Sequence, residues 1–336
     1  MKIVKKNIKL LIGIIIGILI GGSVVIAESI IEANHIKYSN SKTEKTNVQD
    51  AIDELYDLSK NLKYNNFAEI ILKNNQVINK EPTLTTSSNN TSDESGLYKS
   101  TATNSGSSTY YFRGNVENNY VSFAGFIWRI VRINEDGTVR IIMQDGINNN
   151  ALYKFNSNKD NYKYMYYSNS EAKTTLENWY QSNIGNKTEL SNNIAIGNYF
   201  CEQAKVKRES RFTSANSTMT LYTNYVPNFK CITDGNAYDS INSSIGLITY
   251  DEFVYAGGYQ DMNNPNLFLT NKNFLTMSPA GLDNNSAGIW IVGGGGAGGY
   301  TIANYEQHCL RPVLNLKADA QISSGNGTKN NPYLLS

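Results

Sequence analysis

The sequence predicts an α+β protein whose main domain is built on a mixed or antiparallel sheet, preceded by a membrane helix and a short amphipathic helix. Two runs of β-branched and aromatic residues, 126–133 and 138–143, enclose a turn and predict a β-hairpin. Residues 170–184 carry apolar side chains at helical spacing. An uncharged apolar stretch, 10–27, stands near the N-terminus and separates this domain from the start of the chain.

The first element is an export segment, residues 1–27, which is either a signal peptide or a membrane anchor. Lysines at positions 2, 5, 6 and 9 precede eighteen residues without a charge, long enough to span a bilayer. The stretch ends at Ala27, a position that signal peptidase accepts. We therefore expect the membrane to be a partner through residues 10–27. The protein is then a single-pass cell-membrane protein with an extracellular C-terminal domain, or is secreted if cleaved after Ala27.

The charge of the exported part argues against nucleic acid as a partner. The whole chain has a formal net charge of +1, and its first 27 residues hold four lysines and no acidic residue, so residues 28–336 have a formal charge of −3. Proteins that bind nucleic acid electrostatically are basic. The four lysines before residue 10 are instead expected to keep the N-terminus on the cytoplasmic side of the membrane.

Residues 28–63 combine a polar segment with a predicted stalk helix over 46–62. Thr46 followed by Gln49 is a capping box, and the apolar residues Val48, Ile52 and Leu55 recur at helical steps. A helix this short is not stable alone. It packs within its own chain, or on a second copy in a homo-oligomer through residues 46–62, and the sequence leaves both open.

Residues 64–108 are rich in Ser, Thr and Asn, so they are expected to be a linker with at most a short strand near residues 96–98. The α+β ectodomain is expected to span 109–336. Within it, the first strand of the hairpin is apolar on both faces and should lie centrally in its sheet. A strand over 288–292 precedes the glycine run 293–299, which we expect to be a hairpin loop rather than a dinucleotide site, because no amphipathic helix follows.

The three cysteines allow one disulfide. Cys201 and Cys231 bracket a polar stretch, and pairing them closes a loop of about 30 residues, worth roughly 3–4 kcal/mol. Cys309 would then be a free thiol. Because export permits disulfides, this pairing is favoured over three free thiols.

The two adjacent carboxylates Asp251 and Glu252 invite an acid–base interpretation, but local structure accounts for them. Residues 245–248 resemble a short strand, and Thr249 followed by Glu252 is a second capping box. Asp251 would lie in the first helical turn, where a negative charge is favourable. Neighbouring side chains on a helix diverge by about 100°. We therefore predict that Thr249 and Glu252 serve the scaffold and that no catalytic residue is present.

Several stretches resemble known families. Residues 247–257 (LITYDEFVYAG), 274–281 (FLTMSPAG) and 310–316 (LRPVLNL) are similar to segments of formylglycine-generating-enzyme-like and C-type-lectin-like domains. The resemblance implies a C-type-lectin-like fold in which Trp128, Trp290 and Arg311 are structural. The full set of motifs, with the helix sequence NVQDAIDEL, resembles uncharacterised exported surface proteins of low-GC (Firmicutes- or Mollicutes-like) bacteria, for which no activity is implied.

These observations favour a non-enzymatic cell-surface binding or display protein whose ligand is a glycan or a protein. The 23 tyrosines and the Asn-rich loops suit a recognition surface. One alternative is a cell-envelope enzyme using Cys309, which follows His308; another is a structural appendage subunit. No cofactor is expected and no metal site is assigned, although loop carboxylates such as Asp261 and Asp283 leave calcium open.

Overall fold

The computed structural model describes residues 46–54, 66–82, 84, 94–202, 227–231, 240–260, 264, 267–270, 272–283 and 285–335. The chain divides into two compact units, residues 1–63 and 64–336. The export segment 1–27 lies outside the described residues. Among those described, no helix is long and apolar enough to cross a membrane.

The described part of the first unit is a helix over residues 48–54. The Oδ1 atom of Asn47 accepts a hydrogen bond from the Asp50 amide at 2.8 Å. This is the geometry of an N-cap one residue later than the predicted Thr46 cap. Asparagine is at least as good a cap as threonine, which explains the shift. The rest of the predicted 46–62 helix lies outside the described residues.

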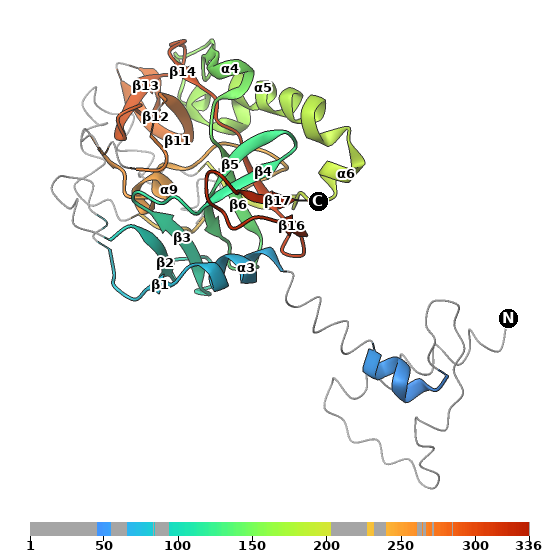
Figure 1. The fold of residues 1–336 in the computed structure, drawn as a ribbon. Coiled ribbons are helices and arrows are strands. Elements are labelled where there is room, and N and C mark those ends of the chain that lie inside the picture. Colours follow the sequence, from blue (N-terminus) through green and yellow to red (C-terminus); the bar gives the residue numbers. More distant parts are fainter. Residues whose placement is uncertain are drawn as a thin grey trace, which may run out of the picture. The chain divides into compact units, whose positions relative to one another are not determined.

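The second unit is a mixed α+β fold dominated by sheets, as predicted (Figure 1). Its largest sheet has nine strands. They are β1 (Val77–Ile78), β2 (Gly96–Ser100), β3 (Thr109–Arg113), β4 (Tyr120–Phe123), β5 (Phe126–Ile133), β6 (Val139–Met143), β15 (Val313–Leu316), β16 (Ile322–Ser324) and β17 (Tyr333–Leu335).

The predicted hairpin forms the middle of this sheet. Strands β5 and β6 are antiparallel, and Gly137 between them takes a φ of 83°, which glycine adopts without strain. Strand β5 also pairs with β3 and β4, so it is central as expected. Trp128 on this strand is fully buried, and its indole N–H donates to the Phe123 carbonyl at 3.0 Å.

A second sheet of six strands is made mostly from the C-terminal third of the chain. Its strands are β7 (Leu152–Tyr153), β10 (Tyr259–Gln260), β11 (Phe274–Asp283), β12 (Ser286–Val292), β13 (Ala297–Ile302) and β14 (His308–Cys309). The glycine run joins β12 to β13, which are antiparallel, so the predicted hairpin loop is confirmed. Strands β8 (Gly197–Cys201) and β9 (Ser240–Ser243) form a separate pair.

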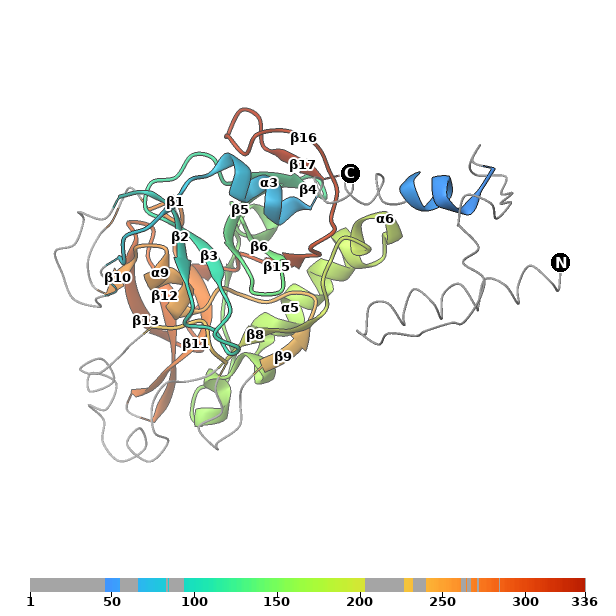
Figure 2. The same cartoon turned by 90° about the horizontal axis from the view of Figure 1, so that it is seen from below.

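The helices are few and short, and they pack on both sheets: the 3₁₀ turn Tyr162–Met165 contacts β11 and β12, and α9 (Tyr250–Tyr255) contacts β3, β11 and β12. Two views show the large sheet lying between helix α3 (Phe67–Asn74) and helix α5 (Glu171–Tyr180) (Figures 1 and 2). Helix α5 continues as one π-helical stretch, Gln181–Gly185. The remaining helical segments are α4 (Ile147–Asn150), α6 (Thr188–Ser191) and the 3₁₀ turn Tyr167–Asn169. The apolar face predicted for residues 170–184 is buried.

Two predictions about boundaries were wrong. Residues 66–82 and 94–108 are part of the compact unit, because Phe67 and Ile71 of α3 are fully buried in its core and Phe67 packs edge-on against Tyr333. Their polar neighbours obscured this short apolar face. The predicted strand at 245–248 is only an isolated bridge between Gly246 and Val313, although its apolar side chains are buried.

Candidate functional site

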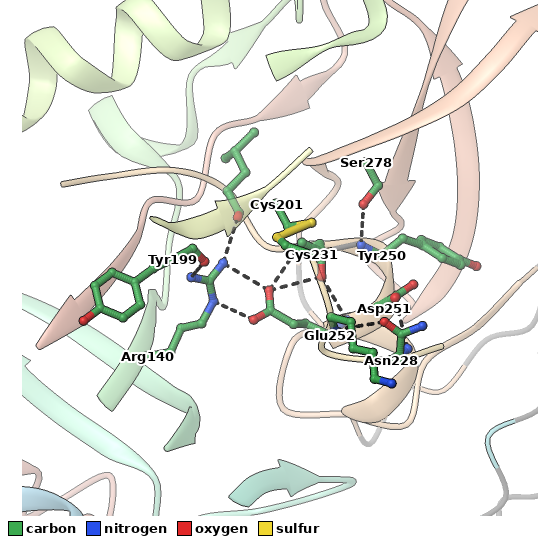
Figure 3. The surroundings of a disulfide bond; sticks show 12 residues. Arg140, Tyr199, Cys201, Asn228, Cys231, Tyr250, Asp251, Glu252 and Ser278 are labelled. Carbon is green, nitrogen blue, oxygen red and sulfur yellow. Dashed lines mark hydrogen bonds and ion pairs between the residues drawn. A yellow bond between two sulfur atoms is a disulfide. The ribbon is translucent and has the colours of Figure 1, made fainter. Parts of the chain in front are cut away.

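A cavity of about 210 Å³ lies beside the disulfide and is lined by both of its cysteines and by the predicted capping residues Thr249 and Glu252. We call it the disulfide cavity. Its lining comes from the loop between β2 and β3, the β5–β6 hairpin, β8, residues 227–231, the start of α9, and β11 (Figure 3). The lining residues are Asn104, Arg132, Asn134, Glu135, Asp136, Arg140, Tyr199, Cys201, Asn228, Phe229, Lys230, Cys231, Thr249, Asp251, Glu252 and Ser278.

The disulfide holds one wall of this cavity in place. Cys201 at the end of β8 is bonded to Cys231, with their Cα atoms 5.5 Å apart, so the predicted pairing is confirmed. The bond fixes the segment 227–231 against the end of β8. Phe229 in that segment stacks on Tyr255 of α9 with ring centroids 4.0 Å apart. This segment therefore lies against helix α9, which it contacts at Tyr255 and, through the Asn228 amide, at Asp251.

The predicted capping box is present at the start of α9. The hydroxyl oxygen of Thr249 accepts a hydrogen bond from the Glu252 amide at 3.1 Å. In return, Oε2 of Glu252 accepts from the Thr249 amide at 3.0 Å. Two backbone donors that the helix leaves unpaired are thereby satisfied.

Glu252 also has a role that the sequence analysis missed. Its Oε1 lies 2.6 Å from Nε of Arg140 and 3.1 Å from Nε of Arg132, while Oε2 accepts from Arg140 at 3.2 Å. Burial alone would raise the pKa of Glu252, but the two guanidinium groups and the Thr249 amide lower it below its ordinary value. The carboxylate therefore serves the cavity as well as the helix.

Arg140 is the most buried member of this group. It is 1 % exposed, and it also donates to the carbonyl oxygen of Tyr199 at 3.1 Å. Its guanidinium lies 4.8 Å from the centroid of the Phe200 ring. Burial lowers the pKa of Arg140 to about 10, against the opposing attraction of Glu252. Arg140 is therefore a cation at neutral pH, and removing Glu252 would leave it buried without its counter-charge.

Asp251 lies in the first turn of α9, as predicted, and it also has a partner outside the helix. It is buried, and its Oδ2 accepts a hydrogen bond from the Asn228 amide at 3.1 Å, so it connects α9 to the disulfide segment. Burial raises the pKa of Asp251 well above its ordinary value, and the neighbouring charge of Glu252 raises it further, against the lowering by the Asn228 amide. Because this environment favours the protonated form of Asp251, its negative charge stabilises the first turn of α9 less than predicted.

The adjacent carboxylates thus sit in opposite environments within one cavity. Two arginines hold Glu252 as an anion, and burial favours the neutral acid at Asp251. Such a separation is typical of acid–base pairs, but ion-pair networks produce it too. Glu252 is committed to Arg140, Arg132 and Thr249, which makes it a poor acceptor for a substrate proton.

The sequence carries one signal for this network. Arg132 and Arg140 stand within otherwise apolar strands, and arginine is rarely buried unless it is paired. Its partner, Glu252, is 112 residues from Arg140 along the chain. A sequence pattern limited to neighbours could not connect them.

The other predicted structural residues lie away from this cavity. Arg311 is fully buried, donates to the carbonyl oxygens of Met143 and Leu269 at 2.9 and 2.8 Å, and lies 4.7 Å from the Phe274 ring centroid. Trp290 packs against Tyr250 with centroids 4.7 Å apart. These contacts link the sheets and helix α9.

Cys309 is a free, buried thiol. Burial raises its pKa above the ordinary value, against a smaller opposing effect of Arg311. Burial also lowers the pKa of His308 to about 4. A nucleophilic cysteine needs a lowered pKa and a base that can accept its proton, so neither shift favours thiolate chemistry.

The residues considered for calcium fall mainly outside the described part of the chain. Asp261 is not described, and neither is the side chain of Asp283. Within the described ranges, no group of three or more His, Cys, Asp or Glu side chains is placed to hold a metal ion.

Comparisons with known proteins add no constraint: no family model, curated protein or solved structure matches this chain.

Proposed function

We propose that this protein is a non-enzymatic binding or display protein of the bacterial cell surface, and that the disulfide cavity is its recognition site. The observation that carries the proposal is that the buried charges of the cavity are paired with one another. Its deep carboxylate is held by two arginines and a backbone amide, which leaves a rigid polar surface rather than a reactive group. Rigid polar surfaces bind without paying an ordering cost.

The mouth of the cavity supports a ligand that carries both signs of charge. The cavity lining includes the cations Arg132 and Lys230 as well as the exposed residues Glu135 and Asp136. The Arg132 guanidinium lies 4.8 Å from the centroid of the Phe229 ring. Arginine and aromatic residues are enriched at protein–protein interfaces, so an arginine over an aromatic ring suits protein recognition. Between the predicted ligands, a glycan or a protein, this favours a polypeptide segment.

Location at the cell surface is supported by two features. The disulfide is expected outside the cytoplasm, and residues 10–27 have the composition of an export segment. The order of elements supports a lectin-like ectodomain as part of the same proposal. Capped helix α9 is followed by the strands β11, β12 and β13, and Arg311 precedes the closing strand β15.

Binding should be tested with the full-length protein in detergent, on whole bacterial and host cells, on immobilised surface proteins and on a glycan array. Lys230→Ala and Asn104→Ala alter the mouth without touching the buried network, and exposed Lys187→Ala is the matched control. We expect a surface ligand whose binding falls at least roughly tenfold in the first two variants only. The absence of any ligand, or equal binding by all variants, would reject the proposal.

The two alternatives are tested separately. The enzyme hypothesis requires Cys309 to react, so slow labelling of this thiol by iodoacetamide in the folded protein argues against it. The appendage hypothesis requires residues 46–62 to assemble. It predicts an oligomer for the full chain that is lost when Val48 and Ile52 are replaced by Asp, measured by light scattering.

A further inference from the structure

A second cavity, of about 580 Å³, lies where the loop after β6 meets helix α5. Its lining includes Phe126, Trp179, Asp145, Asn183 and the three asparagines 148–150, and we call it the asparagine cavity. Its volume lies within the range of about 300–1,000 Å³ common for small-ligand sites. It shares no lining residue with the disulfide cavity among those described.

The backbone of this loop is held in a costly conformation. Asn148, Asn149 and Asn150 have φ values of 50°, 57° and 63°, so three successive residues are left-handed. Residues other than glycine normally visit this region singly, and asparagine tolerates it best. Strain of this kind persists only where the surroundings enforce it, and it clusters at functional sites.

The surrounding contacts enforce the turn. Ile147 is 1 % exposed, and its amide donates to the Leu310 carbonyl at 3.0 Å. The Oδ1 atom of Asn150 accepts from the Gly146 amide at 2.7 Å. The Nδ2 group of Asn148 donates to the hydroxyl of Tyr153 at 2.8 Å. Both ends of the turn are therefore fixed.

The middle residue is the exception. Asn149 is exposed, and within the part of the chain that the structure describes its side chain makes no hydrogen bond. The left-handed turn therefore presents an amide, with a donor and an acceptor, at the cavity. Asn183 adds a second acceptor, because its Nδ2 group is already engaged with the Trp179 carbonyl at 2.8 Å and its Oδ1 remains.

Aromatic rings supply the apolar part of the cavity. Phe126 and Trp179 lie with centroids 5.2 Å apart, and Trp179 in turn contacts Trp128 of the core at 6.4 Å. Trp179 is 8 % exposed, so its ring is held rigidly, whereas Phe126 is only half-buried. The half-buried Phe126 ring, packed on the fixed Trp179 ring, therefore offers an apolar surface beside the hydrogen-bonding groups of Asn149 and Asn183.

We infer that the asparagine cavity binds a neutral saccharide. Sugar hydroxyl groups donate and accept hydrogen bonds, so they can pair with the side-chain amides of the cavity. The C–H face of a sugar ring is apolar and can pack on the Phe126 ring. Among the described lining residues there is no Lys, Arg or His, which disfavours phosphate and other anions. The single carboxylate, Asp145, accepts hydrogen bonds from further hydroxyls. This inference is independent of the proposed function, since it uses a different cavity.

The test uses full-length protein in a detergent without a sugar headgroup. The probes are methyl glucoside, methyl galactoside, methyl mannoside and N-acetylglucosamine, followed by tryptophan fluorescence and saturation-transfer NMR. Sialic acid and choline are the anionic and cationic counterparts. We expect saturable binding of at least one neutral saccharide and of neither charged probe.

Two variants locate the site. Asn149→Gly removes the free amide but suits the left-handed backbone, so it should fold with an unchanged or higher Tm and bind at least roughly tenfold more weakly. Phe126→Leu keeps an apolar side chain but removes the ring face, with the same expected loss of affinity. Exposed Asn192→Ala and the disulfide-cavity variant Lys230→Ala should bind normally.

The inference is overturned if no neutral saccharide binds, if sialic acid or choline binds in preference, or if Asn149→Gly and Phe126→Leu leave the affinity unchanged. Because Lys230→Ala reports on the other cavity, a negative result here leaves the proposed function standing, and a failure of that proposal leaves this one standing.

Discussion

The disulfide cavity and the asparagine cavity hold their polar groups in place in different ways. In the disulfide cavity, side chains of opposite charge hold one another, and Glu252 joins Arg132, Arg140 and the start of α9. In the asparagine cavity, a left-handed backbone turn holds Asn149 outward. The first arrangement depends on ion pairs in a buried setting, and the second depends on conformational strain. Mutations in the first cavity should therefore act by breaking ion pairs, and mutations in the second by changing the strain of the backbone.

The largest expected effect is on the buried ion pairs. Glu252→Gln keeps the side-chain shape but leaves Arg140 buried without its counter-charge, so we expect a loss of about 3–5 kcal/mol in the free energy of unfolding at neutral pH. Glu135→Gln, an exposed carboxyl at the mouth, should change it by less than about 0.5 kcal/mol. Urea unfolding measures the free energy of unfolding of both variants. Equally small losses in the two variants would show that the ion pairs of Glu252 contribute little to stability.

This loss should depend on pH. The folded pKa of Glu252 is lowered, so its contribution is fully present above its unfolded pKa of about 4.3 and is lost as pH falls through the folded value. The difference between wild type and Glu252→Gln should therefore shrink on acidification. A difference that grows in acid would contradict the direction of the shift.

The next largest effect is expected from the disulfide. Replacing Cys201 and Cys231 together by Ser opens a loop with a sequence separation of 30, which should cost about 3–4 kcal/mol in the chain-entropy model. Dithiothreitol should lower the stability of the wild type by a similar amount and leave the double variant unchanged. Reductant sensitivity in the double variant would implicate some other group.

The smallest effect on stability is expected at the strained turn 148–150, and it tests whether backbone strain holds the asparagine cavity. Asn149→Ala cannot adopt the left-handed conformation as easily as Asn, whereas Asn149→Gly adopts it readily. We expect the alanine variant to be less stable than the glycine variant by about 1 kcal/mol, measured by thermal unfolding. Equal stability would show that the turn relaxes in solution.

Local patterns in the sequence predicted much of the fold. The 126–143 hairpin, the Thr249–Glu252 capping box and the apolar face of α5 depend on residues close in sequence, and each is present. Helix α3 was missed because its face is only two turns long and polar residues surround it. Residues 245–248 were predicted as a strand because they are apolar. Their side chains are apolar because they are buried in the core, and only Gly246 forms a bridge, to Val313.

The candidate sites were much less predictable. The partners of Glu252 come from strands more than a hundred residues earlier, so only the fold brings them together. The asparagine turn gave no signal beyond three successive residues that tolerate positive φ. The first-turn position of Asp251 was predictable, but its burial and its bond to the Asn228 amide were not, because the disulfide brings residues 227–231 against α9.

The central claim is that Asp251 and Glu252, adjacent in sequence, have opposite electrostatic environments in one cavity and serve its architecture. Carboxyl-carbon NMR titration of the full-length protein tests this directly, with Asp251→Asn and Glu252→Gln assigning the two signals. We predict that the pKa of Asp251 lies well above its ordinary value of about 3.9 and that the pKa of Glu252 lies below about 4.3. Ordinary values at both carboxyls, or the reverse order, would contradict the account.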